Sequence, residues 1–324
     1  MNKNEIKNAI KGVSEGTYKK LMNPFYAGGA AETAFWLLLS LVPATIVLAQ
    51  ILQVFTLSME AAQNILGAYV SGDFYNLIAP LFEYKARGSV TVLLIAIALM
   101  AGSNTVFTLM RIINQAYGVA PKTDNTIVRT IRDRARAILM TLLVLVTIIF
   151  ALYILVYGEI FVKTALSYTN DLMGYHYTFS EVWYGMRWVI AFILFFLMAF
   201  TVYYFLPRSD VSYKEYFLKS KFATARKIFR VWLKSQRKEF LDALPGSLFT
   251  AVAMLVVTRI YTIFVQYVAR ENINILYGGL SSVVVLLLWF YAMAYVMIVG
   301  IQVNAANREY LSSREQAPAG QTDD

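Results

Sequence analysis

The amino-acid sequence predicts an all-α, polytopic integral membrane protein with six transmembrane helices, both termini in the cytoplasm, and additional amphipathic helices at the membrane surface. Three observations predict this class. The 324 residues are 58% hydrophobic and only 15% charged, with a mean hydropathy of +0.55, whereas about a quarter of the residues are charged in a soluble domain. Six apolar stretches each approach the ~20 residues that cross a bilayer core. The segments between them alternate in lysine and arginine content.

The chain begins with a basic segment, residues 1–32. Ile6, Ile10, Val13 and Leu21 lie close to one helical stripe, and most of the lysines lie outside it. This pattern predicts an amphipathic helix in the membrane interface, attracted to anionic headgroups. A solvated, frayed terminus is the alternative. Residues 1–30 have no compact apolar core of the kind found in a cleavable signal peptide.

The six apolar stretches are expected to be helices because backbone polar groups in hydrocarbon must be hydrogen-bonded within their own segment. They cover Thr33–Phe55, Ser89–Met110, Ala137–Tyr157, Trp188–Leu206, Ser247–Val268 and Leu280–Val303. The N-terminal flank and every second flank after it hold 23 Lys and Arg residues together, and the other flanks hold 5. This bias predicts that both termini are cytoplasmic.

The fourth inter-span segment is the most basic, and it predicts an amphipathic helix over about residues 213–241. Aromatic residues recur there at helical spacing among the eight lysines and arginines of residues 219–238. This helix either lies on the inner leaflet or is only a charged linker. We assign residues 33–310, including this helix, to one transmembrane domain, and 311–324 to a disordered tail.

Composition argues against most enzymatic chemistry. The chain has no cysteine and one histidine, His176, which lies in a segment predicted to face outward. We found no phosphate-binding loop, nucleophile elbow or metal-ligand cluster, so we expect a protein that is not an enzyme and needs no metal or cofactor. The net charge of +9 is explained by juxtamembrane loops. It therefore predicts anionic lipid headgroups at the inner leaflet as partners, and not nucleic acid. The oligomeric state is left open.

Polar residues inside the spans are the candidate binding residues, because each is costly in lipid unless it faces protein or water. Arg259 lies near the middle of the fifth span, where an arginine costs roughly 2.5–3.5 kcal/mol. It either holds an anionic ligand or pairs structurally and snorkels. The other candidates for substrate binding are Ser103, Asn104, Arg111, Asn114, Gln302 and Asn304. Hydrogen bonding between helices is the alternative role for these residues. Pro43, close to Ser40 in the first span, is expected to kink it.

Four blocks of sequence resemble the YihY/BrkB family of bacterial inner-membrane proteins, historically also labelled ribonuclease BN. The first block is AAETAFWLLLSLVP at Ala30–Pro43, and the second is RIINQAYG from Arg111. The third is DALPGS from Asp242, and the last runs from Tyr277 through LLWFY to Asn304. The chain departs from the family pattern at Gln302, where Glu is common, and at Glu32, where a small residue is common.

The resemblance implies a multi-pass protein of the bacterial inner (plasma) membrane, with a suspected role in the transport of lipids or lipopolysaccharide precursors. It also implies structural roles for the motif residues Ser40, Pro43, Pro245, Gly246, Tyr277, Gly278 and Trp289. Three hypotheses follow, in decreasing order. They are a transporter or flippase for a lipid or amphipathic anion, a membrane scaffold that binds lipid or partner proteins through its basic cytoplasmic helix, and a membrane-bound hydrolase.

Overall fold

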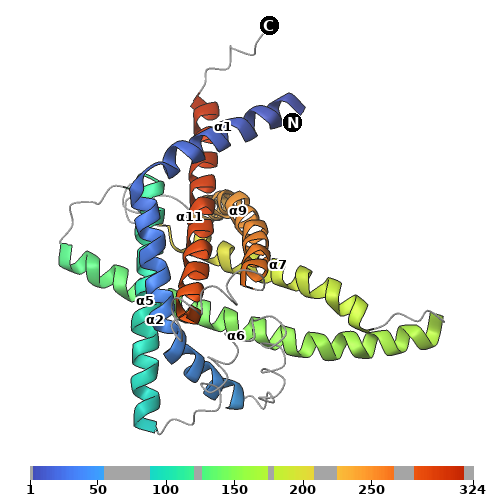
Figure 1. The fold of residues 1–324 in the computed structure, drawn as a ribbon. Helices are drawn as coiled ribbons and strands as arrows, with labels where there is room; N and C mark the ends of the chain where they lie inside the picture. Colours follow the sequence, from blue (N-terminus) through green and yellow to red (C-terminus); the bar gives the residue numbers. More distant parts are fainter. Residues whose placement is uncertain are drawn as a thin grey trace.

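The computed structural model describes residues 3–54, 88–119, 126–173, 179–207, 225–265 and 281–316. Within these ranges the regular structure is helical, as predicted (Figure 1). The helices are α1 (Lys3–Leu21), α2 (Pro24–Val54), α5 (Gly88–Ala116), α6 (Thr126–Met173), α7 (Phe179–Phe205), α9 (Ala225–Phe264) and α11 (Ser281–Gln316). The all-α class is therefore confirmed for the described part of the chain.

Five of the described helices are long and apolar enough to cross a bilayer. The candidate spans are Pro24–Val47, Gly88–Ala116, Trp188–Phe205, Glu239–Phe264 and Val283–Ser313, and they overlap five of the six predicted spans. The remaining predicted span, Ala137–Tyr157, lies within α6 but is not among these five. The protein is thus a multi-pass membrane protein, while the count of six and the cytoplasmic location of both termini stay predictions.

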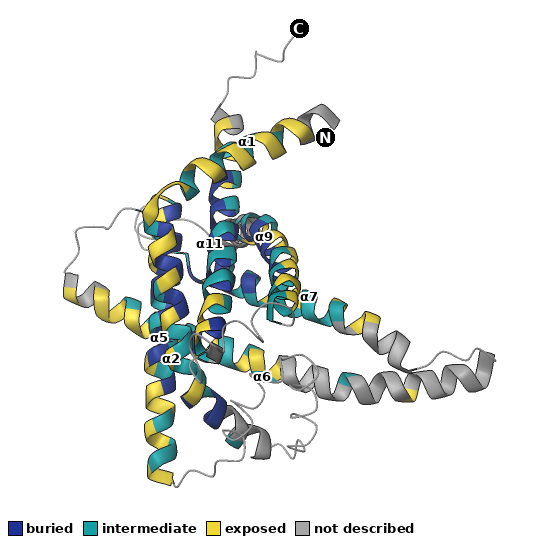
Figure 2. Cartoon of the chain, in the orientation of Figure 1, coloured by how far each residue is buried: buried dark blue, intermediate teal, exposed yellow. Residues whose placement is uncertain are grey.

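Exposed surface supports membrane embedding because large apolar side chains face outward. Val92 and Met100 of α5 are each 68% exposed, and α9 presents Val252, Val256 and Ile260 in the same way. Figure 2 shows how exposed and buried residues alternate along these helices. In water such a surface would be strongly unfavourable, whereas lipid tails solvate it without cost.

The buried apolar core is formed by α2, α5, α7, α9 and α11. α2 packs on α5 and α11, α9 packs on α7 and α11, and α6 packs on α5. Figure 1 shows α11 running through the middle of the molecule and α6 crossing α5 instead of running alongside it. At that crossing a Cβ on Gly102 would lie only 2.8 Å from Thr141 Cγ2, so a small residue lets the two helices meet. Arg136 of α6 holds the end of α7 in place. Its guanidinium donates hydrogen bonds to the carbonyl of Phe205, the last residue of α7, and to the carbonyl of Pro207 just beyond it.

The first helix boundary differs from the expected one. α1 ends at Leu21, and α2 begins at Pro24, well before Thr33. Proline is favoured in the first turn of a helix because its missing N–H would have no partner there. Asn23 caps the new helix, since its Oδ1 accepts a hydrogen bond from the Phe25 N–H at 3.0 Å.

The C-terminal boundary differs as well. The tail from residue 311 was expected to be disordered, but α11 continues as a helix to Gln316. The extension has a packing partner near its start, because the Tyr310 ring lies against α1 at Gly12. Residues 317–324 lie outside the described ranges.

The expected basic helix at 213–241 is helical from Ala225 onward and continues without a break into the fifth span, forming the single helix α9. The start of this segment, residues 213–224, lies outside the described ranges, as do His176, Tyr277 and Gly278. α2 likewise continues through Pro43, and it changes direction part-way along its length (Figure 1). Ser40 satisfies its hydroxyl locally by donating to the Leu37 carbonyl at 2.9 Å.

The contact between α9 and α11 depends on two glycines. A Cβ on Gly246 would lie 2.2 Å from the Gly300 carbonyl oxygen, and a Cβ on Gly300 would lie 2.0 Å from Thr250 Oγ1. The backbones therefore touch directly. Tyr203 of α7 joins them, because its hydroxyl donates to the Met297 carbonyl at 2.7 Å and lies 2.7 Å from Thr250 Oγ1.

Asn304 stabilises α9 where Pro245 interrupts its hydrogen bonding. Pro245 has no N–H to donate within the helix. Next to it, the Gly246 N–H donates to Asn304 Oδ1 at 2.6 Å, and Asn304 Nδ2 donates to the Ala243 carbonyl at 3.2 Å. The side chain of Asn304 is fully buried, so these bonds fix the register of α9 against α11. Trp289, nearer the start of α11, packs against the Tyr261 ring of α9 with the ring centroids 5.8 Å apart.

Candidate functional site

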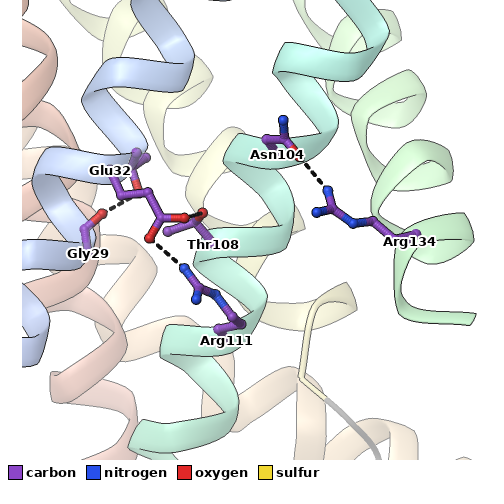
Figure 3. A network of polar contacts seen from close by, with 7 residues as sticks. Gly29, Glu32, Asn104, Thr108, Arg111 and Arg134 are labelled. Carbon is purple, nitrogen blue, oxygen red and sulfur yellow. Dashed lines mark hydrogen bonds and ion pairs between the residues drawn. The ribbon is translucent and has the colours of Figure 1, made fainter. Parts of the chain in front are cut away.

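A stripe of polar and aromatic side chains on α5 forms the centre of the candidate site. Asn104, Phe107, Thr108 and Arg111 are spaced i, i+3, i+4 and i+7, which places them on one face of the helix. The stripe lies between α2 on one side and α6 on the other (Figure 3). Both neighbouring helices contribute a charged side chain to it.

From α2, Glu32 reaches the stripe with both carboxylate oxygens. Its Oε2 forms an ion pair with Arg111 Nη2 at 2.5 Å, and its Oε1 accepts a hydrogen bond from Thr108 Oγ1 at 2.9 Å. α2 approaches closely here because it carries Gly29 one turn earlier, where a Cβ would lie 2.6 Å from Ile112 Cδ1. The structure thus gives Glu32, one of the departures from the family pattern, Arg111 as its counter-ion.

From α6, Arg134 reaches the other side of the stripe. One of its guanidinium nitrogens donates a hydrogen bond to Asn104 Oδ1 (Figure 3). Its guanidinium carbon also lies over the Phe107 ring, 4.3 Å from the centroid, while that of Arg111 lies 5.9 Å from the same centroid. Each of these cation–π contacts contributes about 0.5–2 kcal/mol, and the contribution is larger where water is excluded from the contact. Phe107 thus holds two guanidinium groups in one small region.

The charges in this region are not balanced. Arg111 is neutralised by Glu32, whereas the hydrogen-bond partner of Arg134 in the described part of the chain is the neutral amide of Asn104. The region therefore carries a net positive charge. It is also accessible, because the side chains of Arg111 and Glu32 are 46% and 41% exposed, and Arg134 is exposed. Such an arrangement attracts anions, and two adjacent guanidinium groups suit a phosphate or carboxylate.

The other predicted binding residues are placed elsewhere or play local roles. Ser103 is buried and donates its hydroxyl to the Met100 carbonyl at 2.9 Å, and Asn114 lies partly buried near the end of α5. The side-chain amide of Asn304 is hydrogen-bonded to backbone groups of α9. Gln302 is fully buried beside the Tyr26 hydroxyl, yet neither its Nε2 nor its Oε1 has a well-formed hydrogen bond within the described residues.

Arg259 does not lie in the cluster formed by Glu32, Asn104, Phe107, Arg111 and Arg134. Its side chain is exposed on α9, on the same stripe as Val252, Val256 and Ile263. α9 packs mainly on α7 and α11, whereas the cluster is built from α2, α5 and α6. Arg259 is also close to Phe264, where α9 ends. This position suits an arginine that extends along its helix toward the membrane surface.

Sequence analysis missed Phe107, Thr108 and Arg134 as site residues. The i, i+3, i+4, i+7 spacing of the stripe was the signal available for the first two, because it puts them on the same face as Asn104 and Arg111. No sequence signal selects Arg134 from the neighbouring arginines. Arg132 is exposed, while Arg136 is bonded to the end of α7, and only the crossing of α6 over α5 distinguishes these roles.

Comparison with known proteins agrees with this membrane architecture. Residues 19–226 and 221–323 match the family described as virulence factor BrkB. The chain belongs to the virulence factor BrkB family. The resemblance drawn from the four sequence blocks is thereby confirmed.

A curated relative of this BrkB-family chain is the ribonuclease-like protein YfkH of Bacillus subtilis (strain 168). The two proteins are 23% identical over 279 residues, which is 85% of this chain and 88% of the relative. No solved structure gives a significant match to the chain.

Proposed function

We propose that this BrkB-family protein is a transporter or flippase for a lipid or other amphipathic anion in the bacterial inner membrane. In this proposal the anionic group binds at the arginine cluster, defined here as Glu32, Asn104, Phe107, Arg111 and Arg134. The observation that carries the proposal is the charge of Arg134, which has no acidic partner among the described residues and is held against Phe107 on an exposed part of a membrane-spanning bundle.

The chemistry of the cluster suits a headgroup with several oxygens. A guanidinium group donates parallel hydrogen bonds to phosphate or carboxylate oxygens, and it keeps its charge at every physiological pH. The Phe107 ring holds both guanidinium planes in place before the ligand arrives, which reduces the entropy lost on binding. Glu32 already pairs with Arg111, so an arriving anion competes with this carboxylate for Arg111, whereas Arg134 has no acidic partner among the described residues.

The position of the cluster along α5 suits a ligand that enters from the membrane surface. Arg111 is near the end of α5 at Ala116, on the side that the charge bias predicts to be cytoplasmic. Asn104 is seven residues deeper, or about 10 Å along the axis at 1.5 Å per residue. A headgroup could therefore move from Arg111 toward Arg134 while its acyl chains stay in lipid along the apolar surface of α5.

The test is the rate at which fluorescent phosphatidylglycerol crosses proteoliposome membranes that contain the purified protein. Arg134→Gln removes a guanidinium group that donates charge-assisted hydrogen bonds to the ligand, a loss of about 1.5–3 kcal/mol. We therefore expect the rate at subsaturating lipid to fall roughly 10–100-fold. Arg134→Lys keeps the charge but loses the planar fork, so we expect an intermediate rate.

Arg259→Gln is the matched control, because it removes the same charge from an exposed site on α9. Its rate should stay within about twofold of the original, a change of less than 0.5 kcal/mol. Melting curves of all variants verify folding. A folded Arg134→Gln variant that moves the lipid as fast as the original chain would overturn the proposal, and so would a protein that moves no lipid.

The name of the Bacillus subtilis relative makes ribonuclease activity a second candidate. Glu32 is the carboxylate in the cluster, and both of its oxygens already have partners, Arg111 and Thr108, instead of facing an attacking hydroxyl. We therefore expect purified protein to release no RNA fragments above a mock preparation. Cleavage that disappears in Glu32→Gln would favour the enzyme instead.

A further inference from the structure

One face of α1 is seated on the end of α11. A Cβ on Gly12 would lie 3.1 Å from the Tyr310 ring, and a Cβ on Gly16 would lie 3.3 Å from Ala306 Cβ. One turn further on, Lys20 Nζ forms an ion pair with Glu309 Oε1 at 2.6 Å and donates to the Ala116 carbonyl of α5 at 3.3 Å. Together these contacts fix the rotation of α1 about its own axis.

The junction is strengthened by the end of α5. Arg308 lies over the Tyr117 ring, with its guanidinium carbon 5.5 Å from the centroid. Burial raises the pKa of the Tyr117 hydroxyl well above its ordinary value, so this residue stays neutral. α1 is therefore held by α11 and α5 and is not a freely rotating arm.

The side of α1 turned away from α11 carries exposed apolar and basic side chains. Ile10 is 65% exposed and Tyr18 is 67% exposed, and Met22, just after the helix, is 68% exposed. Lys7 and Lys11 are exposed on the same side, and Lys11 also pairs with the exposed Glu15 at 3.9 Å. Figure 2 shows that most of α1 is exposed, and Figure 1 shows that it lies across the end of α11 instead of continuing the direction of the spans.

We propose that this outward face of α1 docks on the anionic headgroups of the membrane leaflet beside it. Exposed apolar side chains flanked by lysines are typical of helices that lie in the interface, where the rings and aliphatic chains enter the headgroup region and the ammonium groups reach phosphates. The charge of the lysines favours an anionic leaflet as the occupant over a neutral one.

The absence of cysteine from the sequence allows a direct test with single labels. A spin label on Ile10→Cys reports the proposed lipid side, and one on Asn8→Cys reports an exposed polar position on a different side of α1. The full-length protein is placed in nanodiscs that contain either phosphatidylcholine alone or phosphatidylcholine with phosphatidylglycerol. The accessibility of each label to lipid-dissolved oxygen and to an aqueous relaxation agent is then measured.

We expect the Ile10 label to be reached by oxygen and shielded from the aqueous agent in anionic nanodiscs, with the Asn8 label showing the reverse. Changing Lys7 and Lys11 to Gln should lower the ratio of docked to undocked α1 by roughly 10–100-fold. Lys20 is left unchanged because it holds α1 to α11. An Ile10 label that is water-accessible in both lipids would overturn the inference. So would one that is shielded from both oxygen and the aqueous agent, because a protein surface would then cover it. The result does not depend on whether the protein moves lipid.

Discussion

Replacement of Gly300 by alanine tests the close contact between α9 and α11. Alanine normally stabilises a helix interior relative to glycine by about 1 kcal/mol. At Gly300 the added Cβ would lie 2.0 Å from Thr250 Oγ1, 2.6 Å from the Tyr203 hydroxyl and 3.0 Å from the Gly246 carbonyl oxygen. Two of these atoms are held by hydrogen bonds and the third is backbone, so α9 and α11 must move apart.

The expected magnitude follows from these contacts. Overpacking of this kind costs about 1–3 kcal/mol, and weakening the two Tyr203 hydrogen bonds costs about 1 kcal/mol each. After the gain in helix propensity, Gly300→Ala should lower the free energy of unfolding by about 2–4 kcal/mol. Gly28→Ala is the matched control, because a Cβ there meets nothing within 4 Å, and it should instead stabilise the protein by up to about 1 kcal/mol.

The assay is reversible unfolding of the purified protein in mixed micelles, followed for Gly300→Ala, Thr250→Ala and the double variant. Thr250→Ala removes the hydroxyl that the new methyl group would strike. The double variant should therefore lose at least about 1 kcal/mol less than the sum of the two single losses. The packing argument fails if Gly300→Ala is as stable as Gly28→Ala, or if the two changes at the contact are additive.

Two further substitutions on α11 test the buried side-chain amides of Asn304 and Gln302. The first should lower the free energy of unfolding and the second should raise it. Asn304→Ala leaves the polar backbone beside Pro245 without its partner, so it should destabilise the protein by about 2–3 kcal/mol. Asn307→Ala, on a partly exposed residue of the same helix, should change stability by less than about 0.5 kcal/mol, and equal losses for the two variants would contradict the capping role. Gln302→Met replaces a buried amide that lacks well-formed hydrogen bonds with an apolar side chain of similar shape, so it should raise the free energy of unfolding by about 1–2 kcal/mol. A lower melting temperature for Gln302→Met would mean that the amide has a partner.

The sequence predicted the helices well because their signals are local. Long apolar runs and the alternation of basic flanks predict spans without any knowledge of packing. Boundaries set by a single side chain were harder to place. The cap at Asn23 starts α2 before Thr33, and the contact of Tyr310 with α1 accompanies a helix that runs past residue 310.

The candidate site could be predicted only in part, because it depends on how distant segments meet. Arg111 and Asn104 were identified from their cost in lipid, but their partners are Glu32 and Arg134 on other helices. Arg259 attracted attention for the same cost, and the structure places it on the exposed side of α9. Local sequence shows that a polar residue is costly, while the tertiary packing decides how that cost is reduced.

Electron cryomicroscopy of the protein in nanodiscs that contain brominated phosphatidylglycerol tests the central claim most directly. The account predicts headgroup density between Arg111 and Arg134, beside the Phe107 ring, with the brominated chains along the apolar surface of α5. Density for the headgroup beside Arg259, with the arginine cluster occupied only by its own side chains, would contradict it.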